Sequence, residues 1–112
     1  MITLFIDTAD NTKVYIAIHR GNFVYDKTVI LTKGKHAGHP HTRASQTVLT
    51  VVDELLREHA MKVSDITHIK VNPGPGSFTG LRVGIAIANT LSYTLNIPVN
   101  NQPPGSFVTP QY

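Results

Sequence analysis

The spacing of apolar side chains indicates three strands in the first part of the chain. Residues 2–7 carry apolar side chains at both alternating sets of positions, which is typical of a strand covered on both faces. Residues 14–19 alternate between two faces, and Gly21 and Asn22 then predict a tight hairpin into a third strand at 23–31. Two successive hairpins predict an antiparallel meander.

A helical period replaces the alternation after a polar loop at 33–41. Between residues 45 and 60, apolar side chains recur every three or four positions, with Val48 and Val52 on the apolar stripe. This spacing predicts an amphipathic helix. Residues 66–71 then have the pattern of a fourth strand, because a short apolar run is bounded on both sides by turn-forming residues.

A second helix is predicted from Ser77 to about residue 95, with the Ser77 hydroxyl as its N-cap. Residues 97–99 predict a short fifth strand at the edge of the sheet. The order β-β-β-α-β-α-β predicts an α/β fold with a mixed five-stranded sheet and two main helices. We expect one domain over residues 1–100 and an irregular tail over residues 101–112.

Composition narrows the class of protein. A chain of 112 residues with 41% hydrophobic and 15% charged residues is typical of one globular domain. The formal charge of +3 permits an RNA-containing partner without requiring one, because the basic residues form no run. The absence of cysteine excludes disulfides and thiolate chemistry. Since no apolar segment approaches the roughly 20 residues that span a bilayer, and the first residues have no signal-peptide pattern, we expect a cytoplasmic protein without membrane contact.

The most informative stretch is the Gly-rich loop at residues 72–84, Asn-Pro-Gly-Pro-Gly-Ser-Phe-Thr-Gly-Leu-Arg-Val-Gly. Two Pro-Gly pairs predict a rigid turn that leads from a strand into a helix N-terminus, where backbone N–H groups favour anions. The loop lacks the Gly-Lys-Ser/Thr of a P-loop and the spacing of a dinucleotide-binding fingerprint. Two interpretations of the loop therefore stay open: a purely structural turn and a phosphate-binding site. The candidates for nucleotide or phosphate contact are Asp7, Gly74, Gly76 and Ser77.

Small residues recur at every fourth position of the predicted second helix, at Gly80, Gly84 and Ala88. Each glycine costs about 1 kcal/mol of helix propensity relative to alanine, so close packing must offset the cost. Two interpretations stay open at this point. The row packs against the chain's own sheet or first helix, or it forms a helix–helix interface with another subunit.

At this point the sequence resembles a known family. The eleven residues 74–84, together with Ile-Asp-Thr at 6–8, the helix segment 51–56 and Asn-Ile-Pro-Val at 96–99, resemble the TsaB (YeaZ) family of tRNA threonylcarbamoyladenosine biosynthesis proteins, also described as glycoprotease M22-like or Gcp-like. The resemblance covers residues 1–100 and corresponds to the N-terminal lobe of these proteins. It implies an RNase H-like lobe of the actin-like ATPase superfamily.

The resemblance also implies a function. TsaB proteins are non-catalytic subunits that support a TsaD-type transferase, and a TsaE-type ATPase completes the assembly, which modifies position 37 of tRNA. We therefore expect no activity of the isolated chain, a homodimer when it is alone, and contact with tRNA only through the complex. No cofactor is expected for the chain alone; ATP, ADP or threonylcarbamoyl-adenylate is expected only in the complex.

TsaB proteins pair with the TsaD-type subunit chiefly through helices of this lobe, so the resemblance places the partner interface on the two predicted helices. The residues expected to contact the partner are Gly80, Arg82, Gly84, Ala88, Val48 and Val52.

An enzymatic alternative is a nucleotide-dependent phosphotransferase or hydrolase of the actin-like superfamily that uses Asp7 and the Gly-rich loop. Asp7 follows the first strand, where related kinases bind metal or phosphate, yet the residues after it lack the usual glycine. The competing interpretation of Asp7 is a side chain that caps a turn.

No metal site is expected. The two histidines that a TsaD-type metal site would need correspond to Ala44 and Val48 in this sequence. His36, His39 and His41 have spacings that suit two metal ligands, but no carboxylate lies near them to complete the set. We interpret that loop as a solvated segment.

Overall fold

The computed structural model describes residues 1–31 and 40–112, with side chains in the second range described from Ala44 onward. Three strands open the fold: β1 (Ile2–Asp7), β2 (Lys13–Arg20) and β3 (Phe23–Ile30). They form the predicted antiparallel meander, with Ile6 opposite Ile16 and Ile18 opposite Tyr25.

Two helices, a short 3-10 turn and a fourth strand complete the described elements. They are α1 (Pro40–Glu58), the turn Val63–Asp65, β4 (His68–Val71) and α2 (Phe78–Leu95). Strand β4 pairs in parallel with β1, so the sheet order is β3-β2-β1-β4. The crossover that the parallel pair requires is supplied by α1.

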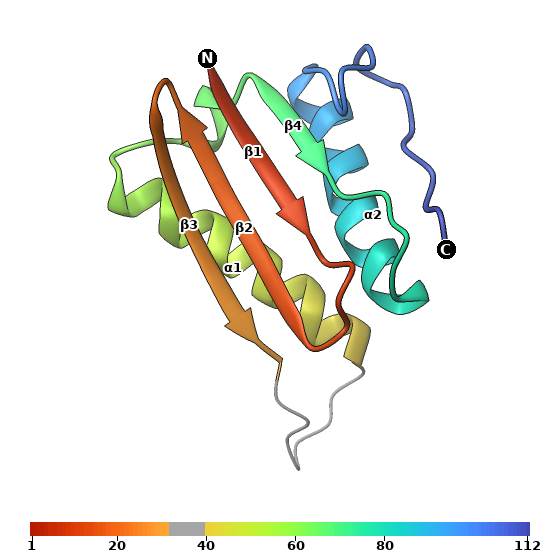
Figure 1. Cartoon of the computed structure of the whole chain (residues 1–112). Coiled ribbons are helices and arrows are strands. Elements are labelled where there is room, and N and C mark those ends of the chain that lie inside the picture. The colour runs from red at the N-terminus through yellow and green to blue at the C-terminus, as the bar shows by residue number, and fades with distance from the viewer. Residues whose placement is uncertain (32–39) are drawn as a thin grey trace.

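Both helices lie on the same face of this mixed sheet (Figure 1). The central side chains of β1 and β2 that point to the helices are fully buried, as Leu4 and Ile16 show. On the other face Phe5 and Tyr15 are half-buried, and no described helix covers them. The expectation that β1 is covered on both faces is therefore wrong for the described residues; its apolar side chain on the open face instead contacts a neighbouring ring, Phe5 against Tyr15.

The prediction of a fifth strand at residues 97–99 is also wrong, because the sheet has four strands in the described residues. Of residues 97–99 only Val99 forms a bridge, to Ile69 of β4. Pro98 has no N–H to donate, and the chain then reverses at Asn100 and Asn101, which both have positive φ. The segment therefore pairs with the β4 edge only around Ile69, through the Pro98 carbonyl and the Asn100 N–H, and then turns away.

Candidate functional site

The N-terminal half of α2 lies against the end of β1 through one buried side chain. The Thr8 hydroxyl donates a hydrogen bond to the Gly80 carbonyl at 2.6 Å and accepts one from the Gly84 N–H at 3.1 Å. Thr8 is 3% exposed, so both bonds form away from water. This contact holds one turn of α2 against the turn that follows β1.

The small-residue row of α2 faces this contact. A Cβ on Gly80 would lie 2.1 Å from the Thr8 carbonyl oxygen, and a Cβ on Gly84 would lie 2.3 Å from the Thr8 hydroxyl oxygen. Ala88 is fully buried, and the Ser92 hydroxyl that continues the row donates to the Ile97 carbonyl at 2.6 Å. Close contacts within the chain itself, with the turn after β1 and with Ile97, therefore account for the row.

The Gly-rich loop is bonded to its own chain at most of the groups proposed for phosphate contact. The Ser77 hydroxyl accepts from the Gly80 N–H at 3.3 Å, as the predicted N-cap, and the Ser77 N–H donates to the Ala9 carbonyl at 2.7 Å. A Cβ on Gly76 would lie 2.7 Å from Ala9. The Gly74 N–H donates to the Asn72 side chain at 3.0 Å.

Asp7 has a local partner as well. Its carboxylate accepts a hydrogen bond from the Ala9 N–H at 3.0 Å, two residues along the chain. This is the geometry of a turn-capping side chain, the competing interpretation given above. Contact of Asp7 with a nucleotide stays a prediction.

The tail after Gln102 lies along α2 and reaches the Gly-rich loop (Figure 1). The Asn89 side chain exchanges two hydrogen bonds with the Val108 backbone, at 3.0 and 2.9 Å. The Gln111 N–H donates to the Pro73 carbonyl at 2.7 Å. Gly74 has φ +114°, and a Cβ there would lie 2.1 Å from the Gln111 carbonyl oxygen. The tail thus contains no helix or strand, yet it is hydrogen-bonded to α2 and to the Gly-rich loop.

The residues expected at the partner interface divide into two groups. Arg82 is exposed, and its guanidinium lies 5.2 Å from the centre of the Phe78 ring. The remaining five are buried within the chain, and these are Gly80, Gly84, Ala88, Val48 and Val52. Val48, Val52 and Ala88 form part of the core, and the two glycines lie against Thr8, so a direct contact with another subunit rests on the surface around Arg82.

The exposed face of α2 carries a feature that the sequence reasoning missed. Besides Arg82, its exposed side chains include Phe78, Ala86, Thr90 and Tyr93. Arg82 is the single charged residue among the 18 of this helix. Surface helices ordinarily present charged side chains to water, and the exposed face of α1 does so. The low charge of the whole helix is the sequence signal for this face, whereas the row of small residues marks the opposite, buried face.

Other candidate chemistry has little support in the described residues. Across 1–31 and 40–112, no group of three or more His, Asp or Glu side chains is placed to hold a metal ion. His36 and His39 lie outside the described residues, as does the side chain of His41. Among the helices of the described ranges, none is long and apolar enough to cross a membrane.

Comparison with known proteins places this geometry in a family. The family model described as "TsaD: tRNA N6-adenosine threonylcarbamoyltransferase" matches residues 36–101. The fold is similar to that of a solved structure, YeaZ from Pseudomonas aeruginosa, with a TM-score of 0.74 and 25% sequence identity. That superposition covers 88% of this chain and 43% of YeaZ.

Curated relatives refine the assignment. The chain is 34% identical to the tRNA threonylcarbamoyladenosine biosynthesis protein TsaB of Bacillus subtilis, over 89% of this chain and 40% of that protein. It is 26% identical to a tRNA N6-adenosine threonylcarbamoyltransferase of Geotalea uraniireducens, over 88% of this chain and 31% of that enzyme. The chain belongs to the TsaB (YeaZ) family. It spans about two fifths of the length of its TsaB relative in Bacillus subtilis.

Proposed function

We propose that the chain is a non-catalytic assembly subunit in tRNA threonylcarbamoyladenosine biosynthesis, which docks on a TsaD-type transferase through the exposed face of α2. The single observation that carries the proposal is the exposed, charge-poor helix face around Arg82, with Phe78 and Tyr93 on it. Protein interfaces are enriched in aromatic residues and arginine and depleted of other charges.

A non-catalytic role is supported by the bonds at the end of β1. The Asp7 carboxylate caps a turn, and the Ser77 hydroxyl caps α2. Among the described residues, no observation favours the alternative of a phosphotransferase or hydrolase built on Asp7. We extend the proposal to an RNase H-like lobe of the actin-like superfamily, to a TsaE-type ATPase in the same assembly, and to a homodimer through the same α2 face.

The test is the dissociation constant of the complex with a TsaD-type subunit from the same organism. Two variants change the charge of the exposed face: Arg82→Glu reverses it at one position, and Ala86→Glu adds a negative charge. Each is expected to weaken binding by about 30-fold or more, because losing the contact of one hot-spot residue costs about 2 kcal/mol of binding free energy. Arg57→Glu is the matched control, since Arg57 is an exposed arginine on α1. Unchanged binding by both α2 variants would refute docking through this face.

A further inference from the structure

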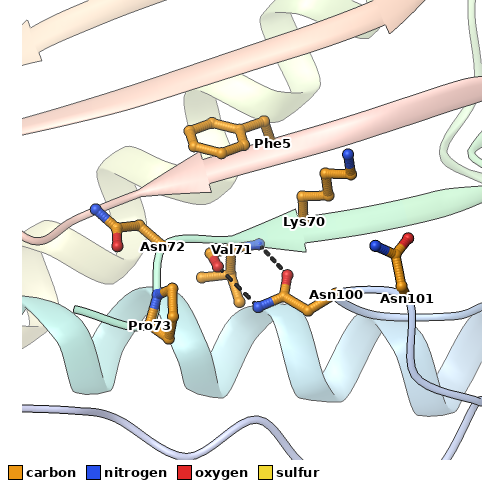
Figure 2. Close-up of a pocket in the computed structure, with 7 residues that line it drawn as sticks. All are labelled: Phe5, Lys70, Val71, Asn72, Pro73, Asn100 and Asn101. Carbon is orange, nitrogen blue, oxygen red and sulfur yellow. Dashed lines mark hydrogen bonds between the residues drawn. The ribbon is translucent and has the colours of Figure 1, made fainter.

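A pocket of about 360 Å³ opens where β1 and β4 end. Figure 2 shows that the Phe5 ring and the Lys70 side chain stand on the same side of the two strands. Amide side chains complete the lining, from Asn72 after β4 and from Asn100 and Asn101 in the turn that follows α2. None of the residues proposed above for phosphate contact lines this pocket.

The sheet register places an aromatic ring in the pocket wall. Phe5 pairs with Lys70 of β4 on one side and with Ala17 of β2 on the other. The Phe5 ring is half-exposed, and it forms a T-shaped contact with the Tyr15 ring at a centroid distance of 6.0 Å. Phe5 therefore presents a half-exposed aromatic ring at the pocket.

The amide wall is held by a tight two-residue turn. Val99 and Gln102 exchange backbone hydrogen bonds at 3.1 and 2.8 Å across that turn. The Asn100 side chain accepts from the Val71 N–H at 2.8 Å and donates to the Val71 carbonyl at 3.0 Å (Figure 2). This bidentate contact fixes the turn against β4, and it leaves the exposed Asn101 amide at the pocket for a ligand.

The charge in the pocket is positive. Lys70 is exposed and makes no ion pair with any residue in the described ranges. No Asp or Glu lines the pocket. Asp7, at the end of β1, uses its carboxylate on the Ala9 N–H. The pocket thus joins one free ammonium group, one half-exposed aromatic ring and unpaired amide capacity, a combination that fits an anionic group attached to a hydrogen-bonding ring.

We propose that this pocket binds a nucleoside phosphate, with the base against the Phe5 ring, the phosphate at the Lys70 ammonium and a polar edge of the base or ribose at the Asn101 amide. Aromatic platforms beside basic side chains are the usual means of holding single-stranded nucleic acid. The same chemistry is present in an RNA strand and in a free mononucleotide. That the source is RNA rests on the proposed function in tRNA modification.

Fluorescence anisotropy with a labelled single-stranded RNA of about 12 nucleotides tests the pocket in the full chain. Phe5→Leu is expected to weaken binding about tenfold, because stacking of one base contributes about 1–3 kcal/mol. Lys70→Gln is expected to weaken binding and to lower the slope of log K against log salt by about 0.7, the value for one phosphate on a single strand. Asn101→Gly is expected to weaken binding about threefold through a lost hydrogen bond, and glycine suits the positive φ at this position.

Lys13→Gln is the matched control, since Lys13 is an exposed lysine outside the pocket; it is expected to bind as the original chain does. Competition with adenosine 5′-monophosphate separates the two sources: displacement of the RNA means that the pocket accepts a free nucleotide, and RNA binding without displacement means that it needs a strand. Binding of neither probe, or RNA binding unchanged in Phe5→Leu, Lys70→Gln and Asn101→Gly, would overturn the proposal.

Docking on the TsaD-type subunit is measured in parallel for Lys70→Gln and is expected to be unchanged. If Arg82→Glu and Ala86→Glu both leave docking unchanged while Lys70→Gln weakens RNA binding, the proposed docking function fails and the pocket stands. If Arg82→Glu abolishes docking while the pocket variants leave RNA binding unchanged, the pocket fails and the proposed function stands.

Discussion

The Thr8 hydroxyl occupies the space that a side chain on Gly84 would need. Its oxygen accepts the Gly84 N–H at 3.1 Å, and a Cβ on Gly84 would approach that oxygen to 2.3 Å. One glycine of α2 thus permits both the buried hydrogen bond and the close approach of the helix to the end of β1. The small residue at this position of α2 therefore has a cause within the chain, independent of any partner.

Gly80→Ala and Gly84→Ala are both expected to destabilise the fold, because a clash costing about 1–3 kcal/mol exceeds the gain of about 1 kcal/mol in helix propensity. The obstacle differs between the two sites. It is the rigid Thr8 carbonyl at Gly80 and the Thr8 hydroxyl at Gly84. Urea unfolding should therefore show the larger loss for Gly80→Ala.

The same two glycine variants are also made in a chain that carries Thr8→Ala. This substitution removes the hydroxyl but keeps the carbonyl, so Gly84→Ala is expected to become nearly neutral in the Thr8→Ala background, whereas Gly80→Ala stays costly. Equal rescue of both glycine variants would contradict this account of the contact. The coupling is read from double-mutant cycles, which isolate the interaction between neighbours.

Asn100→Gly is expected to lower the free energy of unfolding by about 1–3 kcal/mol, because Val71 loses both side-chain hydrogen bonds at the edge of β4. Asn101→Gly is the matched control: both positions have positive φ, and the Asn101 side chain caps no strand. Chemical denaturation of the two variants should separate them. If they are equally stable, the amide contact with Val71 contributes nothing.

Asn89→Ala is expected to release the tail from α2 with little loss of global stability. The variant removes both hydrogen bonds to the Val108 backbone, and these bonds are part-buried, so each contributes about 1 kcal/mol. Hydrogen exchange of residues 106–112 should accelerate, while exchange in β1 and β2 should not. Thr90→Ala, at the next position of the same helix, is the control and should leave the tail protected.

Lys27→Gln is expected to reduce stability only while the lysine of the original chain is charged. The hydrogen bond to Glu58, followed by that to Glu54, raises the pKa of Lys27 above its ordinary value of 10.5. A raised lysine pKa means that the stabilisation is fully present below pH 10.5 and is lost as the pH rises through the higher folded value. The thermal unfolding temperatures of the original chain and of Lys27→Gln should therefore converge above that pH range. They should also converge in high salt, which screens exposed ion pairs. A difference that persists there would mean that packing of the lysine stem is responsible.

Much of the fold and of the family follows from the sequence alone. Alternation at residues 2–7 and 14–19 predicts strands because a sheet face repeats every second residue. The family is recognisable from the sequence because the eleven residues 74–84 resemble the TsaB (YeaZ) family, although the spacing of their small residues by itself left two interpretations open. Ser77 as N-cap was likewise predictable, since the cap is a local interaction.

The tertiary structure decided which surface each pattern faces. A row such as Gly80, Gly84 and Ala88 shows that something approaches the helix closely, but helical spacing cannot tell whether the approaching atoms belong to the same chain. Thr8 lies 72 residues away from Gly80 in sequence, and only folding brings them together. The fifth strand is absent from the described residues because Pro98 has no N–H to donate and the chain reverses at Asn100 and Asn101. The reversed turn is held by the Asn100 bond to Val71 across 29 residues of sequence. Contacts over such separations depend on the whole packing, whereas local patterns depend on their own residues.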